Sequence, residues 1–557
     1  MDGHETDDSG LNEQKIAELR GDLRAIQEYL ERQAAQNVPQ VAYSIDGRTF
    51  SYEAPLSLSL PVGSYVQIQT DDDEQYLGQI ITKDVVKREG VELGLELEVE
   101  RQELFPAGIG LSGVKDRLRV SALEGSGVLL GTVTADAISP TSDTNTFQGA
   151  AIRRADASVV SRYLAGSGER ATLPIGQASY VDGDATVRLD AGGFARHTFL
   201  CGQSGSGKTF SLGIVLEQLL LQTDLRIIVL DPNSDFVSLN RLRPRDEVNR
   251  LRSDPLSADA YERLSERYSD ATEGLTVYRP EAVAGEGDEV LRVRFGDLSR
   301  TEQATVLQLD PLDNPAEFNA FWHVLDGLGQ QEYSWDEVQT AIAHNFTAEA
   351  RQLGLRIENL GLAEWDLWCS PGESSLVDTL ADDEWRCLVL DTGTLDSVAE
   401  QRVVTNAVLT HLWRERHHRR PTLVVVDEAH NVCPQHPDDE LHAISTDTVV
   451  SIAAEGRKFG LYLLLSTQRP SKIQENILSQ CSNLLLMRMN SRSDLSQLAS
   501  IFSQVPANLL SEATKFGLGE TVLGGKFVQN PTFATFEGRL SVEGGSDVPT
   551  TWAERRE

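Results

Sequence analysis

The sequence predicts an α/β protein in three parts: an N-terminal helix, a small β-barrel and a parallel-sheet domain with a helical insertion. Three observations predict this class. Near-continuous apolar runs, typical of parallel strands buried on both faces, recur from residue 173 onward. Shorter strand-like runs fill residues 39–140, and apolar residues at helical spacing mark the start of the chain. The length of 557 residues also exceeds what a single core usually supports.

The first part, residues 1–38, is predicted to be an acidic tail followed by an amphipathic helix. Apolar residues within 11–36 follow one another at intervals of three and four, which is the spacing of a heptad seam. The members of this seam are Ile16, Leu19, Leu23, Ile26 and Leu30. Two heptads fit a helix packed on its own chain as well as a docking helix for a partner, so both interpretations stay open.

Residues 39–140 are predicted to form a small β-barrel or sandwich, because several short strand-like runs alternate there with turn signals. The runs include VAYSI, SYVQIQ, QYLGQII and VELGLELEVE. The Ser/Thr-rich sequence SPTSDTNTFQG follows, and residues 141–172 are predicted to be a linker. The α/β domain is expected over 173–540, with a helical insertion at about 240–385 and a C-terminal tail at 541–557.

The charge balance of the chain is strongly acidic. Asp and Glu number 85 against 50 Lys and Arg, giving a formal net charge of −35, and only nine of the basic residues are Lys. An acid-rich, lysine-poor composition resembles that of cytosolic proteins from halophilic archaea. Net charge bears on solubility and association rather than on fold, so a DNA partner is compatible with it if the contact surface is local.

The apolar pattern predicts neither a transmembrane helix nor a signal peptide. No apolar run reaches the roughly 18 residues that a transmembrane helix needs. The first twenty residues lack the apolar core of a signal peptide. Five widely spaced cysteines do not suggest a disulfide framework. A cytoplasmic protein without a membrane segment is therefore expected.

A phosphate-binding loop is predicted at residues 202–209, between the strand HTFLC and the apolar-periodic helix FSLGIVLEQLLL. The motif G-x-x-x-x-G-K-[ST] is matched by Gly202, Gln203, Ser204, Gly205, Ser206, Gly207, Lys208 and Thr209. Its glycines let backbone N–H groups curl around phosphates at a helix N-terminus. Lys208 is expected to neutralise β- and γ-phosphate oxygens, and the Thr209 hydroxyl to bind Mg²⁺. The sequence thus predicts ATP and Mg²⁺ as cofactors.

The second half of the predicted site follows the buried strand TLVVV, which ends in two carboxylates. Asp427 suits a Mg²⁺ ion bound through a water, and Glu428 suits polarisation of the attacking water. Gln468 follows the next strand, LYLLLS, and is placed to sense the γ-phosphate. A strand-end cap is the alternative role for Gln468.

Further motifs follow one another in a set order along the chain. They are Arg196-His197 before the loop, DPNSD (231–235), DEAHNVCP (427–434), EGRKFG (455–460), STQRPS (466–471), SQCSNLLLMRM (479–489) and GETV (519–522). This ordered set resembles the HerA family, in the HerA/FtsK branch of RecA-like P-loop ATPases, over most of the chain. Two departures are that Asp427 stands where the family often has Glu, and that Asn-Ser replaces the common His-Gly after Asp231-Pro232.

The resemblance implies a RecA-like ATPase core that assembles as a hexameric ring and translocates double-stranded DNA. In such a ring one subunit completes the ATP site of its neighbour. Arg457 matches the arginine supplied in trans, and Arg196 matches a second interface arginine. A surface ion pair is the alternative role for each. A NurA-type nuclease partner in DNA end processing or repair, docked on the barrel or the N-terminal helix, is implied by the resemblance alone.

Two other functions stay open at this stage. A conjugation- or secretion-type ATPase of the same branch would act at a membrane. A nucleotide-gated scaffold, for example in antiviral defence, would recruit an effector without translocating. The residues that contact DNA are not evident from the sequence, because the densest basic stretch, 414–420, closes a predicted helix, where positive charge is favourable.

Overall fold

The computed structural model describes residues 38–89, 119–135, 137–140, 144–165, 170–329, 332–382 and 384–545. The predicted helix at 11–36 and the run VELGLELEVE lie outside the described residues. Two compact units emerge, of which the first runs up to Tyr163 and includes Ser179–Ala185. The second contains Leu164–Ala178 and the residues from Thr186 onward.

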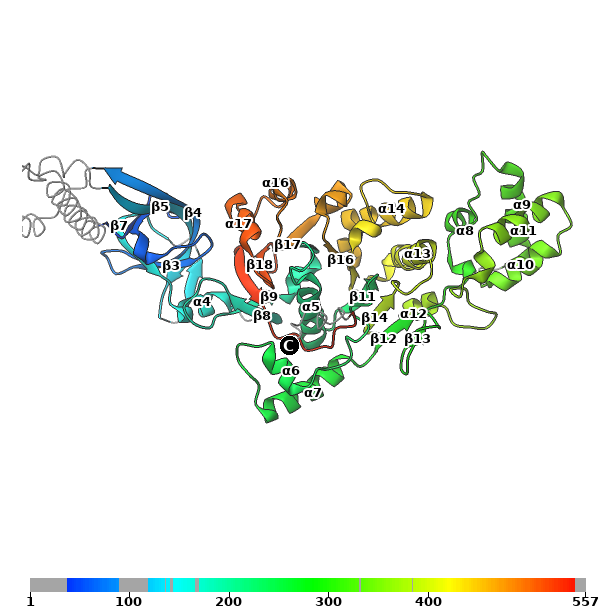
Figure 1. Cartoon of the computed structure of the whole chain (residues 1–557), viewed down its shortest axis with the longest axis horizontal. Helices are drawn as coiled ribbons and strands as arrows, with labels where there is room; N and C mark the ends of the chain where they lie inside the picture. The colour runs from blue at the N-terminus through cyan, green and yellow to red at the C-terminus, as the bar shows by residue number, and fades with distance from the viewer. Residues whose placement is uncertain are drawn as a thin grey trace, which may run out of the picture. The chain divides into compact units, whose positions relative to one another are not determined.

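The first unit is a closed β-barrel of six antiparallel strands (Figure 1). In ring order the strands are β2 (Thr49–Pro55), β1 (Val41–Ser44), β7 (Phe147–Arg154), β3 (Tyr65–Gln69), β4 (Gln75–Glu89) and β5 (Arg119–Val133), which pairs back with β2. Short β6 (Ile138–Pro140) pairs with β5 outside this ring, and a 3₁₀ turn at Leu56–Leu58 follows β2. Alternate residues of β2, Phe50, Tyr52 and Ala54, are buried in the barrel core. The predicted β-barrel is confirmed.

The prediction of a linker at 141–172 is wrong in the part of that range that the structure describes. There β7 closes the barrel between β1 and β3, and helix α4 (Ala157–Leu164) follows it. The buried residues of β7 are Phe147, Ala150 and Ile152, so buried and exposed residues do not alternate regularly along the strand. The strand was missed because its burial comes from two partner strands that are about 80 to 110 residues away in the sequence.

The second unit is built on a sheet of strand order β13-β12-β14-β11-β15-β16-β10-β17-β18-β19-β8-β9 (Figure 1). Strands from β13 to β17 in this order are parallel, and the remainder are antiparallel. The parallel strands are β10 (His197–Cys201), β11 (Arg226–Asp231), β12 (Leu275–Arg279), β13 (Glu289–Val290), β14 (Cys387–Asp391), β15 (Thr422–Val426), β16 (Leu461–Thr467) and β17 (Cys481–Met487). The antiparallel ones are β8 (Thr172–Ala178), β9 (Thr186–Asp190), β18 (Glu520–Gly524) and β19 (Thr532–Phe536).

Six of these strands are the apolar runs that the sequence analysis assigned to a buried parallel sheet. Every residue of β10, β14 and β15 is buried, as expected for strands covered on both faces. In the sheet β16 lies between β10 and β15, so the ends of these three strands share one edge. The predicted RecA-like α/β core is confirmed.

The helices of this core connect successive strands. They are α5 (Lys208–Gln222), α13 (Val398–Arg414), α14 (Glu440–Glu455), α15 (Glu475–Leu478), α16 (Arg492–Ile501) and α17 (Ala507–Ser511). Helix α5 is buried on almost every side, from Ser211 to Leu220. Among the helices that the structure describes, none combines the length and the apolar character that crossing a bilayer requires.

The insertion predicted as helical at about 240–385 is helical only in part. Helices α6 (Arg245–Arg250) and α7 (Ala258–Ala271) lead to β12 and β13, which extend the core sheet beside β14. A helical cluster follows, formed by α8 (Arg300–Val306), α9 (Pro315–Leu328), α10 (Trp335–Ala343) and α11 (Ala348–Asn359), and then α12 (Leu376–Ala381) (Figure 1). Capping boxes begin α8, α10 and α12. The two strands were missed because both are short, and only β12 contains buried residues.

Residues 541–545, predicted to begin a C-terminal tail, are bound to the α/β core instead. The buried carboxylate of Glu217 in α5 accepts the backbone N–H groups of Leu540 and Ser541, both at 2.8 Å. Gly544 donates its N–H to the carbonyl of Asp235, and a Cβ at this glycine would lie 2.0 Å from the Ser234 carbonyl oxygen. The chain therefore needs glycine where it passes the turn at Ser234 and Asp235, and the α/β core extends beyond residue 540.

Candidate active site

The loop at 202–209 joins β10 to the first residue of α5, as its motif predicts. Gly205 and Gly207 have φ angles of 69° and 93°, a region that glycine adopts without steric cost. A Cβ at Gly202 would lie 2.7 Å from Ser206 Oγ and 2.8 Å from Met487 Cβ. The three glycines therefore permit a tight loop at the N-terminus of α5, where anions are favoured.

Lys208 is buried between this loop and the end of β15. Its Nζ donates to Asp427 Oδ1 at 2.6 Å and to Ser466 Oγ at 3.1 Å, and it lies 3.2 Å from Glu428 Oε1. Burial lowers the pKa of Lys208, but the two carboxylates outweigh burial and raise the pKa above its usual value. Lys208 is therefore a fixed cation, and phosphate oxygens entering the loop would compete with Asp427 and Glu428 for it.

Glu428 follows β15 in the left-handed region, with a φ of 45° that non-glycine residues rarely adopt. Its Oε1 accepts a hydrogen bond from Gln468 Nε2 at 2.9 Å, and its Oε2 lies 3.3 Å from His430 Nδ1. Burial raises the pKa of Glu428, but the contacts with His430, Lys208 and Gln468 outweigh it and lower the pKa to about 2. The carboxylate is therefore ionised at neutral pH, in the form that can polarise water.

Gln468 owes its position to the strand order. It follows β16, the strand between β10 and β15, so it reaches Glu428 from the neighbouring strand end. Its side-chain amide contacts a carboxylate instead of capping the strand. Sensing of the γ-phosphate by Gln468 stays a prediction that this position supports.

Thr209 and Asp427 offer oxygen ligands that fit Mg²⁺. Asp427 Oδ2 is buried and has no hydrogen-bond partner, whereas Oδ1 is held by Lys208 and Ser466. Mg²⁺ usually keeps several waters and takes one or two protein carboxylates together with substrate phosphates. Among the described residues no group of three or more His, Cys, Asp or Glu side chains could hold a metal. One hydroxyl and one unpartnered carboxylate oxygen fit a Mg²⁺ ion that is bound jointly with the nucleotide.

Asp235 completes this edge of the site, although its motif had given it no role. Thr209 Oγ1 donates to Asp235 Oδ2 at 3.4 Å. Asp231, at the end of β11, accepts the N–H groups of Asp235 at 3.0 Å and Phe236 at 2.8 Å, and so fixes the turn that presents Asp235. Burial, followed by the charge of Asp427, raises the pKa of Asp235 to about 6. The sequence signal that could have identified Asp235 is its position four residues after Asp231, the acid that ends β11.

A cavity of about 780 Å³ lies at the phosphate loop, which is ample for a nucleotide. The loop, Asp235 and Gln468 line it, but so do Arg250–Arg252 from the end of α6 and Glu543 from the C-terminal segment. The fully buried Arg539 donates to the Thr209 carbonyl at 3.2 Å and to Glu543 Oε1 at 2.9 Å. No motif in the sequence predicted that the end of α6, Arg539 and Glu543 contribute to the site.

Arg196 and Arg457 lie at the opposite edge of the sheet. Arg196 precedes β10, and Arg457 lies in the 3₁₀ turn Gly456–Phe459 that precedes β16, the parallel neighbour of β10. A strand of five residues such as β10 spans about 17 Å, which separates both arginines from the loop of their own chain. Both are exposed, and neither forms an ion pair with any residue that the structure describes. Burial, then the charges of Arg457 and Arg196, lower the pKa of His197 to about 4.

The chain matches a family model and several curated proteins. Residues 173–359 match the family model described as "Helicase HerA, central domain". The curated "DNA double-strand break repair helicase HerA" of Pyrococcus furiosus is 21% identical over 385 residues, which cover 62% of this chain and 66% of that protein. The protein of the same name from Sulfurisphaera tokodaii is 23% identical over 390 residues, covering 68% of this chain and 71% of that protein. The chain thus spans about two thirds of these relatives.

Among solved structures, VirB4 of Thermoanaerobacter pseudethanolicus is similar with a TM-score of 0.43 and 17% sequence identity. The similarity covers 67% of this chain and 97% of the VirB4 chain.

Proposed function

We propose that this HerA-like, ATP-hydrolysing chain is a motor that moves along double-stranded DNA as a ring of identical subunits. A hexamer is the ring size that the family resemblance implies. The relatives reported above are named DNA double-strand break repair helicases, which supports DNA as the track and the processing or repair of DNA ends as the setting. A NurA-type nuclease partner and a cytoplasmic location are proposed from the resemblance and the composition alone.

The observation that carries this proposal is the division of the catalytic groups between two edges of one sheet. Lys208, Glu428 and Gln468 meet at the carboxyl edge, where Lys208 and Gln468 line the cavity. Arg457 and Arg196 stand exposed at the amino edge, without an ion pair among the described residues. An arginine can stabilise the charge that develops on a transferred phosphoryl group only if it reaches that group. A second copy of the chain, which presents its amino edge to the cavity, would meet this requirement.

The geometry suggests how turnover proceeds. The phosphates of ATP enter the loop and take Lys208 from its two carboxylate partners. This removes one of the contacts that restrain Glu428, so its carboxylate can accept a proton from the attacking water. Gln468, hydrogen-bonded to Glu428, stands where it can report the presence of the γ-phosphate. Mg²⁺, bound through Thr209 and Asp427, would neutralise phosphate charge, and the partner subunit's Arg457 would stabilise the transition state.

The proposal is tested by the ATPase rate in molar KCl, with and without linear duplex DNA, for the wild type and Glu428→Gln. We expect strong stimulation by DNA in the wild type and almost no turnover in the variant. Turnover that is indifferent to DNA would contradict the proposal. It would favour a nucleotide-gated scaffold that answers to protein partners instead.

A further inference from the structure

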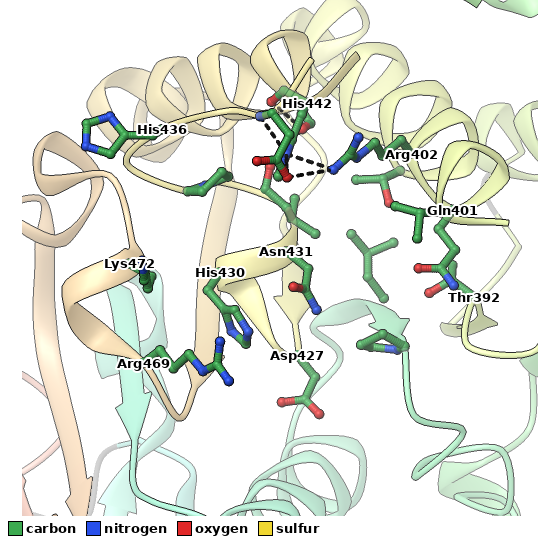
Figure 2. Close-up of a pocket in the computed structure, with 18 residues that line it drawn as sticks. Thr392, Gln401, Arg402, Asp427, His430, Asn431, His436, His442, Arg469 and Lys472 are labelled. Atoms are coloured by element: carbon green, nitrogen blue, oxygen red, sulfur yellow. Dashed lines mark hydrogen bonds and ion pairs between the residues drawn. The ribbon is translucent and has the colours of Figure 1, made fainter. Parts of the chain in front are cut away.

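A second cavity, of about 330 Å³, lies at the same edge of the sheet as the nucleotide cavity. Its walls come from the ends of β11 and β14, from α13 and α14, and from the loops that follow β15 and β16 (Figure 2). Asp427, which follows β15, lines this second cavity. Gln468, which follows the adjacent strand β16, lines the nucleotide cavity instead. The residue after Gln468, Arg469, lines the second cavity. Neighbouring residues at the ends of β15 and β16 therefore line one cavity or the other.

The second cavity carries unpaired positive charge. Its two carboxylates are already neutralised, because Asp427 binds Lys208 at 2.6 Å and Asp438 lies 3.2 Å from Arg402. Arg469 and Lys472, in contrast, are exposed and form no ion pair within the described part of the chain. Figure 2 shows both on the loop after β16, apart from the dashed contacts that hold Arg402. In a chain of net charge −35, two free cations at a cavity form a local site for an anion.

A chain of short contacts joins this cationic loop to the catalytic carboxylate. The backbone N–H of Arg469 donates to Thr467 Oγ1 at 3.0 Å. The same oxygen lies 3.0 Å from His430 Nδ1, and that nitrogen lies 3.3 Å from Glu428 Oε2. His430 lines the second cavity beside these groups. A displacement of Arg469 would therefore change the partners of His430, and with them the restraint on Glu428.

We infer that the second cavity binds a phosphate group of the DNA backbone through Arg469 and Lys472, and that His430 transmits this occupancy to Glu428. The inference rests on the proposed function and deepens it, since it names residues that couple the DNA track to hydrolysis. A bound phosphate draws the Arg469 segment toward the cavity and loosens its bond to Thr467. The freed Thr467 hydroxyl then holds His430 Nδ1 more closely, His430 withdraws from Glu428, and Glu428 becomes available to the attacking water. His430 acts through Glu428 and is a positioning residue.

The anion site is tested with the double variant Arg469→Ala/Lys472→Ala. Binding to duplex DNA is measured by fluorescence anisotropy at several KCl concentrations, and ATPase rates are measured with and without DNA. Removing two phosphate contacts should reduce the slope of log affinity against log salt by about 2. The ratio of DNA-stimulated to DNA-free turnover should fall by on the order of tenfold, which corresponds to about 1.4 kcal/mol. An unchanged slope and an unchanged ratio would overturn the inference.

A matched control removes positive charge elsewhere on the same unit. Arg263→Ala/Arg267→Ala takes two exposed arginines from α7, away from the second cavity, and should keep the wild-type slope and ratio. An equal loss in this control would mean that general charge, and not this cavity, attracts DNA. Inorganic phosphate at millimolar concentration is a further arm, because DNA-free turnover that rises with it would assign the cavity to free phosphate instead of DNA.

The positioning role of His430 is tested by His430→Ala and His430→Asn. The alanine variant should keep the salt slope of DNA binding but lose the stimulation of turnover. Asparagine places an amide close to where Nδ1 stands, so it should restore part of the stimulation. A loss of DNA binding in His430→Ala, or no rescue by asparagine, would contradict coupling through Nδ1. If the wild type itself neither binds DNA nor responds to it, the proposed function fails first.

Discussion

Removal of the Arg457 guanidinium should abolish ATP turnover while ATP binding remains. Arg457 is exposed, lies at the amino edge of the sheet, and is separated from its own phosphate loop by the length of a strand. An arginine supplied in trans contributes about 10³- to 10⁵-fold to turnover, equivalent to roughly 4–7 kcal/mol of transition-state stabilisation. Arg457→Ala should therefore lose activity to that extent. Lys458→Ala, which removes the adjacent exposed cation 3.9 Å from Glu455, should stay active.

Co-assembly of two inactive variants tests whether Arg457 acts on a neighbour. Arg457→Ala and Lys208→Ala are co-expressed with different tags, and rings that carry both tags are purified. A site is active only where an intact Lys208 meets an intact Arg457 of the next subunit. For independent sites and equal mixing, about a quarter of wild-type turnover should return. Wild-type turnover in Arg457→Ala alone, or no recovery in verified mixed rings, would refute the reasoning.

Three further outcomes follow from the site. Glu428→Gln should lower turnover by about 10²- to 10⁴-fold, the usual contribution of a general base, with ATP binding retained in a calorimetric titration. MgATP affinity should fall as pH drops through about 6, because Asp235 takes up a proton below its raised pKa, and Asp235→Asn should flatten that part of the profile. Arg539→Leu leaves the buried Glu217 without its guanidinium partner at 3.7 Å, and should cost about 3–5 kcal/mol in urea-induced unfolding of the nucleotide-free protein.

Most of the α/β core could be predicted from the sequence because its signals are local. A buried parallel strand reads as an apolar run, and the phosphate loop requires glycines and a lysine at set spacing. These features predict β10, β15 and the loop at 202–209 from the sequence alone. The resemblance to HerA, read from the order of the motifs, is confirmed by the family match and the curated relatives. The halophilic origin and the hexamer stay predictions.

The elements and site residues that were not predicted depend on contacts between segments that lie far apart in the sequence. Strand β7 is buried only because β1 and β3 flank it, and β12 only because it joins β14. Asp235 reaches Thr209 because Asp231 holds the intervening turn, and residues 541–545 stay in place because Glu217 accepts their backbone N–H groups. Hydrogen bonds between segments from 26 to 324 residues apart leave no periodic signal in the sequence.

Movement along DNA is the central claim, and its most direct test is ATP-driven displacement of a protein roadblock from linear duplex DNA in high salt. Wild-type protein should displace the roadblock with ATP but not with a non-hydrolysable analogue, and Glu428→Gln should fail with either. Robust ATP hydrolysis that leaves the roadblock in place would contradict translocation, even if DNA stimulated the hydrolysis.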